Sequence, residues 1–284
     1  MLKFQHWYGA CFPMRRFVAT SMRRRVPVQK THTNTKMYTK KLQITTAAIG
    51  LMSIASLSTA KAELEGALTG SISLDMNSHF ISYGADVWAD GERTFNPAVS
   101  INYAINDQWT FTTGFWLDVN DNASSSFETV ETDVWVGLSY TTGITTISGT
   151  FQNWQYAGVS EEVFDLGISL DTFLSPSLTI HKRFNAGGSG GFEGTFAVLG
   201  FKHGFDVTDD FSVSVPVSIG WALDEFHTTE DGYGFASVGL QGSLAINACS
   251  SFNFGVSYYD TDSGVTGNAD NSFFTYNAGF SYDF

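Results

Sequence analysis

Acidic residues recur at every second position in parts of this sequence. Glu131 and Asp133 are two residues apart in "VETDVWVGLSY", and Asp118 lies near the end of "QWTFTTGFWLDV". Carboxylates gathered around a narrow aqueous passage attract cations and repel anions. That chemistry requires one common surface, and the residues predicted to share it are Asp75, Asp118, Glu131, Asp133, Asp165, Arg183, Trp116 and Trp135. The alternative is that these acids pair with the few bases or are simply hydrated.

A second possible chemistry needs a histidine beside a nucleophile and an acid, as in hydrolases with a Ser–His–acid arrangement. His79 and His227 lie in or beside polar segments, and Ser78, Asp224 and Glu225 are near them in sequence. No serine signature of a phospholipase accompanies these histidines. The sequence therefore predicts no catalytic residues and no enzyme.

The elements that must position these side chains are strands, because period-two alternation dominates from residue 63 onward. In "FSVSVPVSIGWAL", residues 211–223, large apolar residues alternate with a mostly Ser and Gly face. About twelve strands are predicted, at 66–76, 98–104, 108–119, 130–140, 145–156, 162–171, 177–184, 194–204, 211–223, 233–245, 251–260 and 273–284. Their lengths are near those that a tilted strand needs to cross a bilayer.

The connections between these strands alternate in length. Short turns are expected at 105–107, 141–144, 172–176, 205–209 and 246–250. Longer polar links are expected at 77–97, 119–128, 185–193, 224–232 and 261–272, with a shorter one at 157–160. Tight turns on one rim and long loops on the other predict an all-β, up-and-down antiparallel transmembrane β-barrel with an even number of strands.

The polar face of the strands consists mostly of Ser, Thr, Gly and Asn, whereas a soluble exterior carries many charges of both signs. Aromatic residues near the predicted strand ends are typical of interfacial girdles: Tyr103, Trp109, Phe111, Tyr140, Phe211, Trp221, Tyr258, Tyr282 and Phe284. We therefore expect lipid against the apolar face and a lumen against the polar face. The sheet must then close into a barrel, since the unpaired backbone groups of an open sheet edge are not viable in hydrocarbon.

Charge divides the chain near residue 62. Residues 1–62 contain no acidic residue and eleven of the 15 basic ones, whereas residues 63–284 hold 28 acidic and four basic residues, a formal charge of −24 that excludes nucleic acid as a partner. Residues 37–62 have the basic start, apolar stretch and small-residue end of a signal peptide, with cleavage expected after Ala62. Residues 1–36 are interpreted as an over-long start or a basic leader, and residues 63–284 as the barrel.

Two acidic loops, 224–232 and 259–271, are rich in oxygen ligands. Neither has the spacing of an EF-hand or of glycine-rich calcium repeats. We expect solvated loops, no metal site and no cofactor. Divalent ions that bridge these loops to lipopolysaccharide phosphates are the alternative.

The last predicted strand alternates aromatic residues and ends with Phe280, Tyr282 and Phe284. This pattern resembles the signal by which bacterial outer-membrane proteins engage the barrel-assembly machinery. The resemblance implies the outer membrane of a Gram-negative cell, with its lipid and lipopolysaccharide as neighbours.

Residues 68–122 resemble the start of the TorF-type porins, a family of small outer-membrane barrels. The shared features are a loop with Tyr83-Gly84 where the family has Arg-Gly, then Asn96-Pro97-Ala98, then an aromatic and glycine-rich strand from Trp109 to Trp116. The resemblance implies a channel for passive diffusion of small solutes, and the acidic residues add an expected preference for cations. A non-conducting structural or surface-interaction barrel and a hydrolase at the membrane rim are the alternatives.

Overall fold

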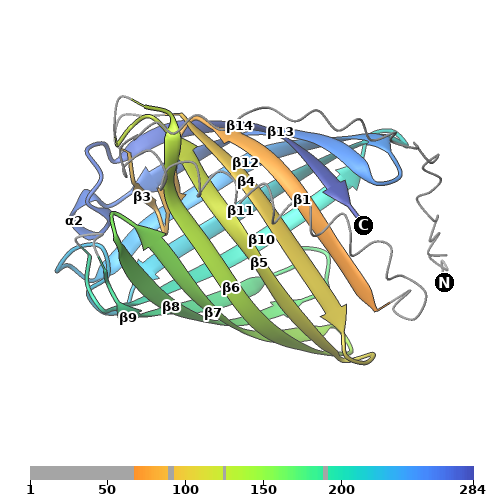
Figure 1. Cartoon of the computed structure of the whole chain (residues 1–284), viewed down its shortest axis with the longest axis horizontal. Helices are drawn as coiled ribbons and strands as arrows, with labels where there is room; N and C mark the ends of the chain where they lie inside the picture. The colour runs from red at the N-terminus through yellow and green to blue at the C-terminus, as the bar shows by residue number, and fades with distance from the viewer. Residues whose placement is uncertain (1–66, 89–92, 124–125, 188–190) are drawn as a thin grey trace, which may run out of the picture. The chain divides into compact units, whose positions relative to one another are not determined.

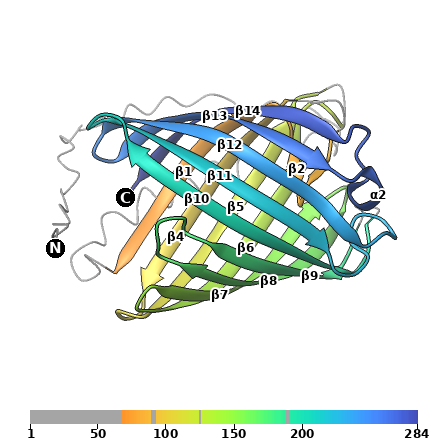
Figure 2. The same ribbon diagram turned by 180° about the vertical axis from the view of Figure 1, so that it is seen from behind.

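The computed structural model describes residues 67–88, 93–123, 126–187 and 191–284. Within them, twelve strands form one closed antiparallel barrel (Figures 1 and 2). The expected leader (1–36) and signal peptide (37–62) lie outside the described residues. No helix in the described part of the chain is long and apolar enough to cross a membrane.

The barrel strands follow one another in chain order, and the last strand pairs with the first. They are β1 (Leu68–Asn77), β4 (Thr94–Ala104), β5 (Trp109–Asn120), β6 (Glu128–Thr142), β7 (Thr145–Tyr156), β8 (Val159–Leu170), β9 (Ser177–Asn185), β10 (Thr195–Asp206), β11 (Phe211–Ala222), β12 (Gly232–Asn247), β13 (Ser250–Thr261) and β14 (Ser272–Asp283). Each corresponds to one predicted segment. The predicted fold class is confirmed.

The outer surface of the barrel is apolar. Val134, Val136 and Leu138 are successive outward residues of β6 and are 41%, 49% and 43% exposed. A surface of this kind is stable against hydrocarbon but not against water. Aromatic pairs lie toward both rims, with Trp109 and Tyr140 4.9 Å apart between ring centroids near the short turns. The apolar face is therefore the lipid face.

Three short elements were not predicted, because each is too short to show a period. β2 (Ile81–Ser82) and β3 (Ala85–Asp86) form a two-stranded hairpin in the link between β1 and β4. α2 (Ser263–Thr266) lies in the link between β13 and β14. Both structures are found at the long-loop end of the barrel (Figures 1 and 2). We call residues 78–88 the loop hairpin.

Candidate functional site

Acidic and aromatic side chains share the inner wall of β5, β6 and β7. The strand register pairs Asp133 with Trp116 on one side and with Trp154 on the other, so that one carboxylate lies between two indoles. The next inward row pairs Asp118 with Glu131. Paired residues of an antiparallel sheet project to the same side, and the large apolar residues between these positions face outward.

The other predicted residues also lie on the inner wall. Asp165 Oδ1 is 2.6 Å from His181 Nδ1, and Asp75 pairs in register with Gly279 between outward neighbours. The Trp135 indole lies against Gly114. A Cβ at position 114 would lie only 2.4 Å from the indole, so the glycine makes room for it. All eight predicted residues thus project inward, whereas their part in a conducting path stays a prediction.

These side chains do not form one open ring. Asp118 is 0% exposed, and its carboxylate accepts hydrogen bonds from Trp88 Nε1 (2.9 Å) and Asn120 Nδ2 (2.8 Å). Arg183 is 2% exposed and forms an ion pair with Glu161. Sequence alternation gave the direction of each side chain but could not distinguish these sealed groups from those that face a cavity.

The loop hairpin crosses the bore of the barrel. Its turn residue, Tyr83, has a φ of 47° and leads into Gly84, whose φ is 87°. The Tyr83 ring centroid lies 5.8 Å from that of Trp154 in β7, 4.3 Å from His181 in β9 and 5.8 Å from Phe196 in β10. In the strand order, β9 and β10 are halfway around the barrel from β1 and β4, which carry the hairpin.

Further contacts tie the loop hairpin to its surroundings. The Asp86 N–H donates to Asn268 Oδ1 (2.8 Å), and Asn268 Nδ2 donates to the Gly84 carbonyl (2.9 Å). The His79 ring stacks on Phe273 at 5.4 Å. The hairpin is therefore held from several sides. Tyr83-Gly84 within a polar link is the sequence signal that could have predicted its turn, because glycine favours positive φ.

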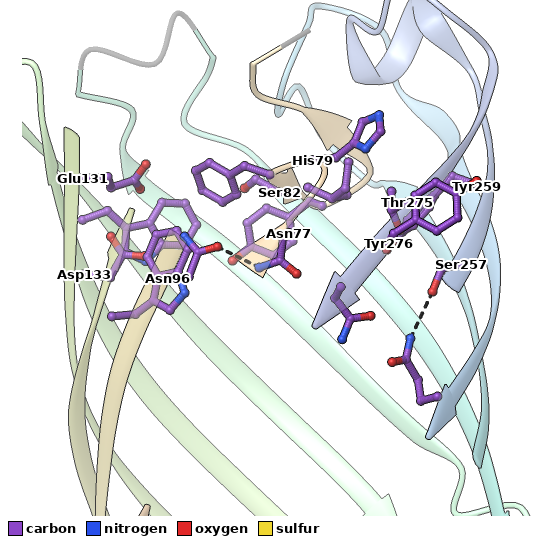
Figure 3. Close-up of a pocket in the computed structure, with 17 residues that line it drawn as sticks. Asn77, His79, Ser82, Asn96, Glu131, Asp133, Ser257, Tyr259, Thr275 and Tyr276 are labelled. Atoms are coloured by element: carbon purple, nitrogen blue, oxygen red, sulfur yellow. Dashed lines mark hydrogen bonds between the residues drawn. The ribbon is translucent and has the colours of Figure 1, made fainter. Parts of the chain in front are cut away.

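A cavity of about 570 Å³ opens beside the loop hairpin. Figure 3 shows Glu131, Asp133 and Asn96 on one wall and Ser257 and Tyr259 on the facing wall, with hairpin residues between them. We call this space the hairpin cavity. A second hollow of about 370 Å³ lies along the inner wall of β5 to β8.

The barrel is similar to the COG4313 outer membrane channel from Pseudomonas putida F1, with a TM-score of 0.51 and 11% identity over 77% of this chain and 96% of that chain. The chain has the fold of an outer-membrane channel. A KdgM porin and a NanC porin are also similar, with TM-scores of 0.48, identities of 11% and 10%, and coverage of 75% and 74% of this chain and 99% and 98% of theirs. The sequence matches no family model and no curated protein.

The residues considered for hydrolase chemistry are only partly brought together: Ser78 and His79 are in contact, whereas Asp224 lies 3.7 Å from Lys182. Ser78 Oγ lies 2.8 Å from His79 Nδ1, but it also accepts the Tyr276 N–H at 2.8 Å, and Asp86 is 3.8 Å from His79 Nε2. These contacts hold the loop hairpin against β14. His227 instead packs near Tyr83. Among the described residues, no group of three or more His, Cys, Asp or Glu could hold a metal ion.

His227, in the link between β11 and β12, makes the docked hairpin sensitive to acid. Burial and, to a smaller extent, the nearby Arg183 guanidinium together lower its pKa to about 4, although hydrogen bonds with backbone groups of Tyr83 and Ser82 act in the opposite direction. Neutral His227 therefore favours docking fully above its ordinary pKa of about 6.5, and this contribution is lost as the pH falls toward 4. We expect amide-exchange protection of residues 78–88 to fall by up to about 100-fold between pH 7.5 and 4.5, after correction for intrinsic rates.

The control for this experiment is a pair of variants. His227→Gln should lose most of the pH response. His203→Gln changes a histidine that packs against Phe173, with the ring centroids 4.1 Å apart, at the opposite rim, and this variant should respond as the unmodified protein does. An equal response in the two variants would contradict a role for His227.

Proposed function

We propose that this protein is a porin-like channel of a Gram-negative outer membrane, through which small solutes diffuse passively with a preference for cations. The observation that carries the proposal is a closed barrel with an apolar outer surface around an inner wall rich in carboxylates. The likeness to the COG4313 channel supports this fold, and the passage of solutes is our inference from it.

The charge balance of the inner wall supports the cation preference. Arg183 projects inward from β9, and its charge is already balanced by Glu161. Lys182 alternates to the outer side of β9, where its amine lies 3.7 Å from Asp224. Among the described residues that line the cavity, no Lys or Arg accompanies Glu131 and Asp133. Such a passage attracts cations.

Neutralising the two cavity carboxylates tests this proposal. The double variant Glu131→Gln, Asp133→Asn should reduce the ratio of cation to anion permeability by about threefold or more, because two lumen charges are lost without a change of size. The measurement is the reversal potential of single channels in a salt gradient across a planar bilayer. Asp270→Asn, which alters an exposed loop, should leave the ratio unchanged. Equal selectivity in all three proteins would contradict the assignment.

The loop hairpin favours a second candidate, a non-conducting structural or surface-interaction barrel, because it crosses the bore. A folded protein that gives no channels in the bilayer would support this candidate. A hydrolase at the rim would instead show ester cleavage that depends on Ser78 and His79.

We also propose the finer assignments made from the sequence. These are membership of the TorF-type porins, export by a signal peptide cleaved after Ala62, and assembly through Phe280, Tyr282 and Phe284 by the barrel-assembly machinery. The expected partners are outer-membrane lipid, lipopolysaccharide and small solutes. The backbone of Phe284 exchanges two hydrogen bonds of 2.9 Å with Gly70. The last residue therefore also takes part in the pairing of β14 with β1, which closes the barrel.

A further inference from the structure

The hairpin cavity has the size and lining of a small-molecule site. Its volume of about 570 Å³ lies within the range of about 300–1,000 Å³ typical of such sites. Its walls come from barrel strands on two sides and from the loop hairpin (Figure 3). Among the described residues that line it there are two carboxylates and no Lys or Arg.

The two carboxylates are available to a positively charged ligand. Glu131 is 9% exposed, and Asp133 Oδ1 is buried and has no hydrogen-bond partner among the described residues. The side chains of Glu131 and Asp133 also interact with each other, and two carboxylates that share one site are costly unless a positive charge lies beside them.

Aromatic rings surround the same carboxylates. Trp116 and Trp154 flank Asp133 across the strands, and hairpin rings cover both indoles, with Phe80 5.1 Å from Trp116 and Tyr83 5.8 Å from Trp154. Aromatic walls favour alkylated ammonium groups, which interact with the π-face and shed water more readily than a small inorganic cation does. The lining therefore favours an organic cation.

The amides of the cavity argue against a neutral sugar. Asn77 Nδ2 donates to Asn96 Oδ1 (2.7 Å), and Asn96 Nδ2 donates in turn to the Leu117 carbonyl and to Asp118 Oδ1, both at 3.2 Å. These donors are already used within the wall. Recognition of a sugar needs free donors as well as acceptors, and on this wall the two amides are engaged while the groups beside them are the carboxylates of Glu131 and Asp133.

We propose that the hairpin cavity binds small organic ammonium ions, with Asp133 and Glu131 as anionic partners and Trp116 and Trp154 as apolar walls. This inference rests on the proposed cation-preferring channel and names its ligand class. The ammonium group is placed between Asp133 and Glu131, and its alkyl chain lies along the indoles.

Calorimetric titration of the folded barrel in detergent tests the inference without any need for conduction. The probes are butylammonium, its near-isosteric neutral analogue 1-butanol, potassium and sorbitol. Butylammonium should bind at least about tenfold more tightly than each of the others. Asp133→Asn should weaken butylammonium binding by about tenfold or more, and Asp270→Asn should leave it unchanged.

The outcomes separate this inference from the proposed function. Equal binding of butylammonium and 1-butanol, or tighter binding of sorbitol, would overturn the inference even if the protein conducts. Butylammonium binding by a protein that gives no channels would support the site and overturn the channel. If Asp133→Asn fails the heat-modifiability test for folding, the comparison of probes on the unmodified protein decides the matter.

Discussion

Replacing Tyr83 with Ala is expected to raise the single-channel conductance of the barrel about threefold or more. The Tyr83 ring is the contact between the loop hairpin and the opposite wall, where it meets rings from β7, β9 and β10 and lies 5.0 Å from Phe226. Truncating a buried aromatic residue costs about 3–5 kcal/mol, and for the partly buried Tyr83 we expect the lower end of that range. A loss of that size shifts the equilibrium between docked and released hairpin by more than about 100-fold.

Alanine is the right substitution because it leaves the backbone strain at position 83 unchanged. Tyr83 has a φ of 47°, and Ala meets the same strain there, whereas Gly would relieve it. The change therefore reports the loss of the ring. Tyr103→Ala removes a tyrosine of the lipid-facing surface and should leave conductance as it was. Unchanged conductance in Tyr83→Ala would show that the hairpin does not limit passage.

Replacing Arg183 with Met is expected to lower the free energy of unfolding by about 3–5 kcal/mol. The side chains of Arg183 and Glu161 are 3% and 1% exposed and form an ion pair. Arg183 Nη1 also donates to the Phe226 carbonyl at 2.8 Å, and the guanidinium lies 3.9 Å from the Phe226 ring centroid. Without the cation, a buried carboxylate loses its counter-ion and the link between β11 and β12 loses its donor.

A double-mutant cycle with Glu161→Gln distinguishes the ion pair from general packing. The double variant should lose less stability than the sum of the two single variants, because neither charge is then left alone. The measurement is urea unfolding in lipid vesicles, followed by tryptophan fluorescence. Lys182→Met changes the neighbouring, more exposed pair and should cost no more than about 1 kcal/mol. An Arg183→Met effect equally small would be inconsistent with a buried pair.

The strands could be predicted because lipid outside and water inside impose strict alternation on every crossing. The largest difference is at β4, which begins at Thr94 and not at residue 98. Pro97 lacks an N–H and interrupts the apparent pattern, yet it pairs in register with Leu74 of β1. On its other side, the register with β5 passes from Phe95 directly to Ala98, so the missing donor falls at an irregular point of the ladder.

The candidate site could be predicted only in part. Alternation places Glu131 and Asp133 on the inner wall, since that direction is a local property of a strand. The contacts of Tyr83 with Phe196 and Phe226 join residues more than a hundred positions apart, and no local pattern encodes them. The seal over Asp118 depends in the same way on Trp88, which the loop hairpin delivers from another part of the chain.

The loop hairpin is attached to one wall of the barrel and packs against the opposite wall, so it also restrains the cross-section of the barrel. The diameter of a closed barrel is set by its number of strands and their stagger, but hydrogen bonds between neighbouring strands do not tie opposite walls to each other. Here the aromatic side chains around Tyr83 connect opposite walls of the barrel. Moving these walls apart would first have to separate the Tyr83 ring from Trp154 and Phe196. Uneven lateral pressure from the bilayer would therefore act on the same few aromatic contacts that hold the loop hairpin across the bore.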